Sequence, residues 1–341
     1  MSTLIKWFLR LVQVVFVLVL LAGVGGCYAA YLMFAPGTGP SERVFDIQPG
    51  TTLNDLALRL EDDKYIRNAL AFRVLAKAVN MGGLQAGRYK LSASMSPFEI
   101  LTTLKKGPQE EPGIMVTIPE GKTLREVAEI LQERAGLPGR DFELLAITPR
   151  RLFPNRTWLP ARATAEGFLY PDTYKIPVDA RPSQVLDMML TRFEEAALPA
   201  FAEARVPISR LMEKITLASL VEAEAQVSGE RPRIASVYVN RMRYGMKLEC
   251  DATVQYALGK RKPVLLYEDL KVESPYNTYL YTGLPPGPIC NPGLSCIRAA
   301  LRPAASEYLY YVRNDKKNDG SHVFSRSYAE HEQAIYRYQN P

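Results

Sequence analysis

The longest uncharged stretch of this sequence, residues 11–35, constrains where the rest of the chain can fold. It contains 25 residues, follows Lys6 and Arg10, and precedes the first acidic residue, Glu42. At about 1.5 Å per helical residue, a run of this length can cross a hydrocarbon core of about 30 Å. The basic residues on its short N-terminal side favour a cytoplasmic N-terminus. We therefore expect residues 1–10 in the cytoplasm, a single transmembrane helix over 11–35, and the remainder outside the inner membrane.

A second interpretation of the same stretch concerns Cys27. The sequence VGGC at residues 24–27 loosely resembles the site at which a lipoprotein leader is cleaved before a lipidated cysteine. However, residues 28–35 continue the apolar run, whereas a lipidated cysteine normally opens onto a polar tether. The uncleaved anchor is therefore the favoured interpretation, and both place the protein on the outer side of the membrane.

Composition fits a globular protein and excludes several chemistries. The 341 residues suffice for two domains of roughly 150 residues, with 47% hydrophobic and 23% charged residues. The four cysteines form no CxxC pair, and His322 and His331 lack metal-ligand spacing, so no metal site, serine-protease relay or disulfide scaffold is expected. The net charge of +6 comes from basic residues interspersed with acids, so nucleic acid is not expected as a partner.

Two segments of the chain resemble each other at a constant offset of 71 residues. They are residues 45–60 (FDIQPGTTLNDLALRL) and residues 116–131 (VTIPEGKTLREVAEIL). Each predicts a short strand, a turn containing glycine, a helix N-cap at Thr52 or Thr123, and an amphipathic helix.

These patterns predict an α+β chain of three parts. After a linker at residues 36–43, residues 44–110 give the order strand–helix–helix–strand, which resembles a small LysM-like βααβ module. Modules of that kind often bind glycans, but a module that only positions the next domain explains the pattern equally well. Residues 111–341 predict a larger mixed catalytic domain with a helical core, mainly helical over 182–258 and with a strand at 308–313.

The most informative helix is predicted over residues 209–227, and the apolar half of this helix contains two carboxylates, Glu222 and Glu224. At i and i+2 they diverge by about 200° around a helix, so they cannot face one cleft. Glu224 ends the more apolar stripe, formed by Leu217, Leu220 and Val221.

Partial burial at the end of that stripe raises the pKa expected for Glu224. A carboxyl group that stays protonated near neutral pH is what a general acid requires. The alternative is a carboxylate at the solvated end of a core helix, paired with Arg241 or Arg243.

Several blocks of the sequence resemble, in order, the endolytic murein transglycosylase (YceG-like) family. They are LASLVEAEAQ at 217–226, RIASVYVNRMRYGMKLECDATVQYAL at 233–258, YNTYLYTGLPPGPICNPG at 276–293, and YLYYVRND followed by GSHVF at 308–324. EGFLYPDTY at 166–174, AGRYKL at 86–91 and the single membrane anchor fit as well.

This resemblance implies an activity on peptidoglycan, with no cofactor. The bond cleaved is the β-1,4 linkage from N-acetylmuramic acid (MurNAc) to N-acetylglucosamine (GlcNAc), and the product carries a 1,6-anhydro-MurNAc end. The family's catalytic residue is the second Glu of a Glu-x-Glu pair, which corresponds to Glu224, although the usual intervening Lys is Ala223 here. The muramic C6 hydroxyl attacks C1, so no second enzymic carboxylate is needed. The family's usual role in ending nascent glycan strands implies penicillin-binding synthases as partners.

Supporting residues are expected around Glu224 with substrate-binding roles. They are Glu222, Asn240, Asp251, Tyr276, Asn277 and Tyr279. For Asn240 an interhelix hydrogen bond is an equally good explanation, and for Asp251 a helix N-cap is the simplest one. Tyrosines offer apolar ring faces and a hydroxyl to a sugar.

Three cysteines, Cys250, Cys290 and Cys296, lie on the oxidising side of the membrane in this topology. One disulfide is compatible with that placement, most simply Cys290–Cys296, but the sequence does not select the pair.

Two other functions compete with the transglycosylase. One is a non-catalytic peptidoglycan-binding scaffold that recruits synthases through the LysM-like module. The other is a conventional muramidase hydrolase that pairs Glu224 with Asp251.

Overall fold

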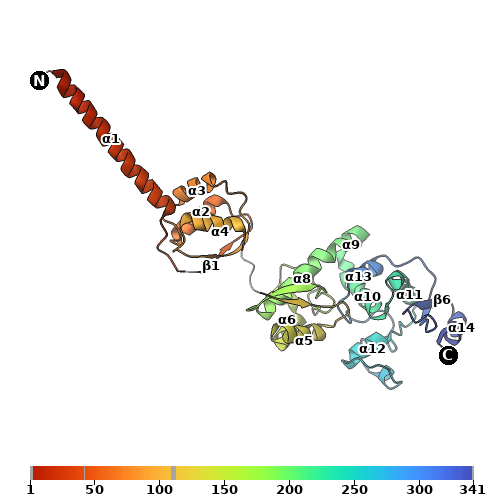
Figure 1. Ribbon diagram of the computed structural model, residues 1–341. Helices are drawn as coiled ribbons and strands as arrows, with labels where there is room; N and C mark the ends of the chain where they lie inside the picture. The colour runs from red at the N-terminus through yellow and green to blue at the C-terminus, as the bar shows by residue number, and fades with distance from the viewer. Residues whose placement is uncertain (1–2, 42, 109–112, 340–341) are drawn as a thin grey trace. The chain divides into compact units, whose positions relative to one another are not determined.

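The computed structural model describes residues 3–41, 43–108 and 113–339, and the chain folds as two compact units (Figure 1). The predicted domain boundary between residues 110 and 111 lies outside the described residues. So do residues 1–2 of the predicted cytoplasmic segment and residue 42 of the predicted linker.

The chain begins with one long helix, α1 (Thr3–Phe34). Its apolar part, Val12–Phe34, has 23 residues and a mean hydropathy of 2.2, and it is the only candidate span among the described residues. This agrees with a single-pass membrane anchor. Cys27 lies inside α1, which continues for seven more residues to Phe34.

The rest of the first unit consists of three helices and one pair of strands. Its elements are β1 (Arg43–Ile47), α2 (Leu53–Asp62), α3 (Ala69–Ala78), β2 (Gly87–Leu91) and α4 (Pro97–Lys106). β1 and β2 are antiparallel, and Phe45 lies opposite Tyr89 over the core. The predicted β–α–α–β order is therefore present, and its likeness to a LysM module stays a prediction. The sequence pattern did not indicate α4, which begins at a Ser96–Glu99 capping box.

The second unit consists mainly of helices with two antiparallel strand pairs. Its elements are β3 (Gly113–Thr117), α5 (Leu124–Ala135), α6 (Gly139–Ile147), α7 (Pro149–Leu152), β4 (Thr173–Pro177), α8 (Pro182–Ala196), α9 (Leu198–Ala204), η1 (Ile208–Arg210), α10 (Leu211–Glu224), η2 (Ser228–Glu230), α11 (Arg231–Arg243), α12 (Asp251–Leu258), η3 (Asp269–Lys271), α13 (Leu294–Leu301), β5 (Tyr310–Arg313), β6 (His322–Ser325) and α14 (Tyr328–Gln339). β3 pairs with β4, and β5 pairs with β6. The chain is thus a mixed α and β protein, as expected.

Helix α10 occupies the middle of the second unit, where it packs against α11, α12 and α13 (Figure 1). Residues Leu211 and 214–221 are all buried, so side chains on every side of this stretch meet protein. Because the buried run stops at Val221, the last turn of α10 leaves the core and is available to form a site.

The two similar segments adopt the same local structure. In both, the threonine at the helix start forms a capping box with the residue three positions later, Thr52 with Asp55 and Thr123 with Glu126. The preceding turn contains a glycine with a positive φ angle in each case, which a residue with a side chain rarely adopts. The predicted strand, turn and cap are confirmed in both copies.

Candidate active site

Glu224 is the last residue of α10, and the chain then turns through η2 into α11. The final carbonyl groups of a helix carry partial negative charge, and they make a carboxylate at this position less favourable. Its partly buried side chain lines a cavity of about 290 Å³. The residues around this cavity come from five helices or strands and the loops between them: Glu224, Val237, Tyr238, Arg241, Leu248, Glu249, Asp251, Tyr279, Tyr310, Tyr311 and His331.

The surroundings of Glu224 favour its protonated form. Burial is the largest cause that raises its pKa above the ordinary value, and the charge of Asp251 raises it further. Hydrogen bonds from Cys250 and Tyr311 and the interaction with the His322 imidazole lower the pKa of Glu224. The Cys250 thiol donates to Glu224 Oε1 at 3.3 Å. The pKa remains raised on balance, as the apolar stripe of the helix predicted.

Hydrogen bonds and a ring contact connect Glu224 through Tyr311 to His322 and the buried Glu230. The hydroxyl groups of Tyr311 and Tyr238 are 2.9 Å apart, and the edge of the His322 ring faces the ring of Tyr311. Glu230 accepts hydrogen bonds from the backbone N–H of His322 at 3.1 Å and contacts its Nδ1 at 2.9 Å. The buried Glu230 carboxylate therefore fixes His322 and, through it, the β5–β6 hairpin that carries Tyr311.

Sequence reasoning placed none of Cys250, Tyr238, Tyr311 and His322 in the site around Glu224. All four lie inside the sequence blocks that carry the family resemblance, which was the available signal. His322 had been considered only as a metal ligand. Among the residues that the structure describes, no group of three His, Cys, Asp or Glu side chains is arranged to hold a metal ion.

Two predicted residues, Asp251 and Tyr279, lie in the same cavity as Glu224. The Tyr279 hydroxyl donates to Asp251 Oδ1 at 2.6 Å. Asp251 is the first residue of α12, but it does not cap that helix, because the cap position is Cys250 and no side-chain capping bond forms. The carboxylate of Asp251 is exposed and faces the cavity, while Tyr279 holds one of its oxygens.

Glu222 points away from this cavity. Its Oε2 accepts a hydrogen bond of 2.8 Å from the N–H of Gly293, the residue before α13. Partial desolvation raises the pKa of the nearby Glu120, and the charge of Glu222 raises it further. The structure places Glu222 at the junction of α10 with α13, which argues against the expected contact with substrate.

Asn240 and Asn277, expected to contact the substrate, are both buried and hydrogen-bonded to backbone carbonyls. Asn240 is buried, and its amide donates to two backbone carbonyls in residues 306–308 at 2.9 and 3.0 Å. Asn277 is 0% exposed, and its amide donates to two backbone carbonyls in residues 270–272 at 2.9 and 2.8 Å. Both side chains use their N–H groups to hold loops in place.

Arg241 does not form the ion pair with Glu224 that the alternative interpretation required. Its guanidinium donates to the backbone carbonyls of Lys247, Leu248 and Leu309 and to the carboxylate of Glu249. It therefore ties the loop before α12 to β5 at the edge of the cavity.

The cysteines are not paired. Cys250, Cys290 and Cys296 are all buried free thiols, so the disulfide that the sequence allowed, most simply Cys290–Cys296, is not formed. The Cys290 thiol instead donates to the carbonyl of Ser219 in α10 at 3.4 Å.

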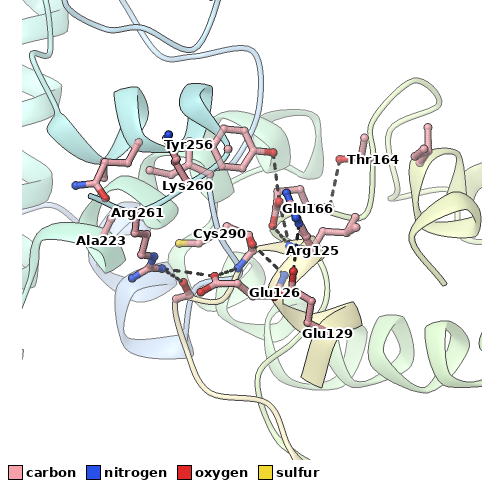
Figure 2. Close-up of a pocket in the computed structure, with 18 residues that line it drawn as sticks. Arg125, Glu126, Glu129, Thr164, Glu166, Ala223, Tyr256, Lys260, Arg261 and Cys290 are labelled. Atoms are coloured by element: carbon pink, nitrogen blue, oxygen red, sulfur yellow. Dashed lines mark hydrogen bonds and ion pairs between the residues drawn. The ribbon is translucent and has the colours of Figure 1, made fainter. Parts of the chain in front are cut away.

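A second, larger cavity of about 780 Å³ is lined in part by Ala223, the residue before Glu224 in α10 (Figure 2). Glu166 lies in its wall and is 5% exposed. Its carboxylate accepts hydrogen bonds from the Leu124 N–H at 2.9 and 3.1 Å, the Tyr256 hydroxyl at 3.2 Å and the Asn291 amide at 3.2 Å. Burial raises the pKa of Glu166 to about 8, although these hydrogen bonds lower it.

Tyr276, predicted near Glu224, instead packs against Tyr256 beside this larger cavity, with ring centroids 4.8 Å apart.

Comparison with known proteins gives consistent matches over most of the chain. The model of the YceG-like family matches residues 45–337. A Bacillus subtilis (strain 168) protein named endolytic murein transglycosylase is 32% identical over 308 residues, which cover 86% of this chain and 84% of that protein. A protein of the same name from Streptococcus pneumoniae serotype 2 is 30% identical over 86% of this chain, but the match spans only 58% of that longer protein. The crystal structure of a YceG-like protein from Listeria monocytogenes superposes with a TM-score of 0.56 at 32% identity, covering 86% of this chain and 99% of that one.

Proposed function

This chain belongs to the YceG-like family, and we propose that it is a lytic transglycosylase that cleaves peptidoglycan glycan strands internally. The observation that supports this most directly is Glu224, a partly buried carboxyl group with a raised pKa that lines a cavity. Homologues named endolytic murein transglycosylase support the same class of reaction.

In the proposed reaction, Glu224 acts first as an acid and then as a base. It donates its proton to the oxygen between C1 of MurNAc and C4 of GlcNAc, and the C1–O bond breaks. The C6 hydroxyl of the same MurNAc attacks C1, and its proton passes to Glu224, which is thereby restored. The product is a 1,6-anhydro-MurNAc end, and no water or cofactor is consumed. An intramolecular hydroxyl has a high effective molarity, so it replaces a protein nucleophile.

Asp251 has a separate part in this scheme. Positive charge develops at C1 as the glycosidic bond breaks, and an exposed carboxylate in the same cavity stabilises it. The bond from Tyr279 restrains the Asp251 carboxylate, so this charge is already in position before the reaction.

The position of Asp251 also supports a second candidate, a conventional muramidase hydrolase. An acid and a carboxylate in one cavity are the two groups that a glycosidase needs, the second as nucleophile or to activate water. Such an enzyme leaves a reducing MurNAc end in place of an anhydro end.

Mass spectrometry of purified peptidoglycan digested by the full chain tests the proposal. Products with anhydro-MurNAc ends, which borohydride does not reduce, are expected. Reducing MurNAc ends would establish the hydrolase instead. No products at all would favour the non-catalytic scaffold.

The membrane anchor suggests where this activity operates. We propose that α1 holds the catalytic unit at the outer face of the inner membrane, in the periplasm, where new glycan strands emerge. There it would end strand elongation next to penicillin-binding synthases, with the LysM-like unit contacting the same glycan. Crosslinking of the full chain in membranes, with and without active synthesis, tests that partnership.

A further inference from the structure

The second cavity has no part in the proton transfers assigned to Glu224, yet it lies directly beside that residue. Ala223 lines the larger cavity and Glu224 the smaller one, and these are consecutive residues at the end of α10. At the start of α12, Ala252 likewise lines the larger cavity and its neighbour Asp251 lines the smaller one. The two cavities are therefore adjacent across the ends of two helices.

The larger cavity has an apolar interior and a rim of charges of both signs (Figure 2). Arg125 contacts Glu129 at 3.2 Å, and Arg261 lies 3.6 Å from Glu126. The exposed Lys260 has no side-chain hydrogen bond or salt bridge to any residue that the structure describes. Three cations thus face two rim carboxylates, since burial keeps Glu166 protonated at neutral pH.

The glycan backbone of peptide-bearing strands does not account for such a rim, because GlcNAc carries no charge and the lactyl carboxyl group of MurNAc is consumed in the amide bond to the stem peptide. The stem peptide of peptidoglycan does, because it combines free carboxylates, an amino group in many species, and alanine methyl groups. This peptide is attached through the lactyl group on C3 of MurNAc, the same sugar whose C1 reacts. A pocket for it must therefore lie within one sugar of the catalytic carboxyl group.

We propose that the cavity between α5 and α12 binds the stem peptide of the MurNAc residue that undergoes cleavage, with Lys260 contacting a peptide carboxylate. This inference rests on the proposed transglycosylase function and adds a specificity site to it. It makes peptide-bearing strands the preferred substrate and gives Lys260 a role in substrate choice without a role in bond cleavage.

The first test compares glycan strands that carry stem peptides with strands from which an amidase has removed them. The wild-type chain is expected to show a higher kcat/KM on peptide-bearing strands. Lys260→Glu should reduce this preference about tenfold, mainly through KM, because it replaces a charge-assisted contact with a repulsion. The control is Arg181→Glu, which reverses an exposed charge at the start of α8, outside the cavity, and should keep the wild-type preference.

Two results would overturn the inference. A wild-type chain without any preference between the two substrates would show that the peptide is not recognised. An equal loss on both substrates in Lys260→Glu would assign the cavity to the glycan backbone.

A binding measurement separates this inference from the proposed activity. The synthetic peptide L-alanyl-γ-D-glutamyl-meso-diaminopimelyl-D-alanine is titrated calorimetrically into the full chain in detergent. Binding that weakens about tenfold in Lys260→Glu, but not in Arg181→Glu, supports the site even if no anhydro products form. Absence of binding to a chain that does cleave strands would refute the site and leave the activity intact.

Discussion

Replacing Glu224 with Gln tests the mechanism with little change to the structure. The amide keeps the size of the side chain and can still accept the hydrogen bond from the Cys250 thiol. It cannot donate a proton to the glycosidic oxygen. General acid–base catalysis contributes about 10²–10⁴-fold, so kcat/KM should fall by at least that factor, which corresponds to roughly 3–5 kcal/mol in the activation free energy. The midpoint of thermal unfolding should not decrease, since the change removes a buried acid that burial and Asp251 already disfavour in its charged form.

Glu222→Gln is the matched control, two residues away on the same helix. Its amide oxygen can still accept the hydrogen bond from the Gly293 N–H, and the loss of charge relieves repulsion with Glu120. Activity should therefore stay within about threefold of wild type, since less than 1 kcal/mol is at stake in the activation free energy.

The assay is the release of anhydromuropeptides by each purified variant, with circular dichroism to confirm folding. Near-normal activity in Glu224→Gln together with an inactive Glu222→Gln would show that the acid is Glu222 and that the helical-face reasoning is wrong. If neither change matters, α10 does not carry the catalytic acid.

Three further expectations concern pH, stability and topology. Glu224 must be protonated to act, so kcat/KM falls as pH rises through its pKa. Tyr311→Phe removes a hydrogen bond that lowers this pKa, so it should move the alkaline limb of the pH profile to higher pH. Asp251→Asn removes a charge that raises this pKa, so it should move the same limb to lower pH. Opposite shifts would contradict the assignment. The raised pKa of Glu166 stabilises the fold fully below the unfolded value near 4.5, and this contribution is lost as pH rises to about 8, so thermal unfolding midpoints should decline less over that interval in Glu166→Gln. A C-terminal reporter that requires an oxidising compartment should be active and Cys27→Ser should stay membrane-bound, whereas a reporter active only in the cytoplasm would reverse the topology.

Local features of the fold were predictable because the residues that determine them are neighbours in sequence. The capping boxes at Thr52 and Thr123 each need only a threonine and an acid three positions later. The same holds for the divergence of Glu222 and Glu224, which follows from helical geometry alone. A pattern of this kind also located the catalytic candidate, since the end of an apolar stripe is visible without any tertiary contact.

The surroundings of the site were not predictable in this way. Cys250 contacts Glu224 across 26 positions of the chain, and Tyr311 pairs with Tyr238 across 73. The hydrogen bonds of Asn240 and Asn277 were unpredictable for the same reason. An asparagine available to a substrate has the same chemistry as one whose N–H groups already bind backbone carbonyls, and only the folded chain distinguishes them.

The contrast between Glu224 and Asp251 explains how one cavity supplies two different carboxyl groups. Glu224 ends α10, where burial and the helix carbonyls disfavour a negative charge, and it is therefore suited to hold a proton. Asp251 begins α12 and is exposed to the cavity, where the Tyr279 hydroxyl donates to its Oδ1. In the proposed mechanism Glu224 is therefore the acid, and Asp251 stabilises the positive charge that develops at C1. Each of these residues is also next in sequence to an alanine that lines the neighbouring cavity, so a sugar bound between Glu224 and Asp251 in the proposed mechanism lies beside the site proposed for its peptide.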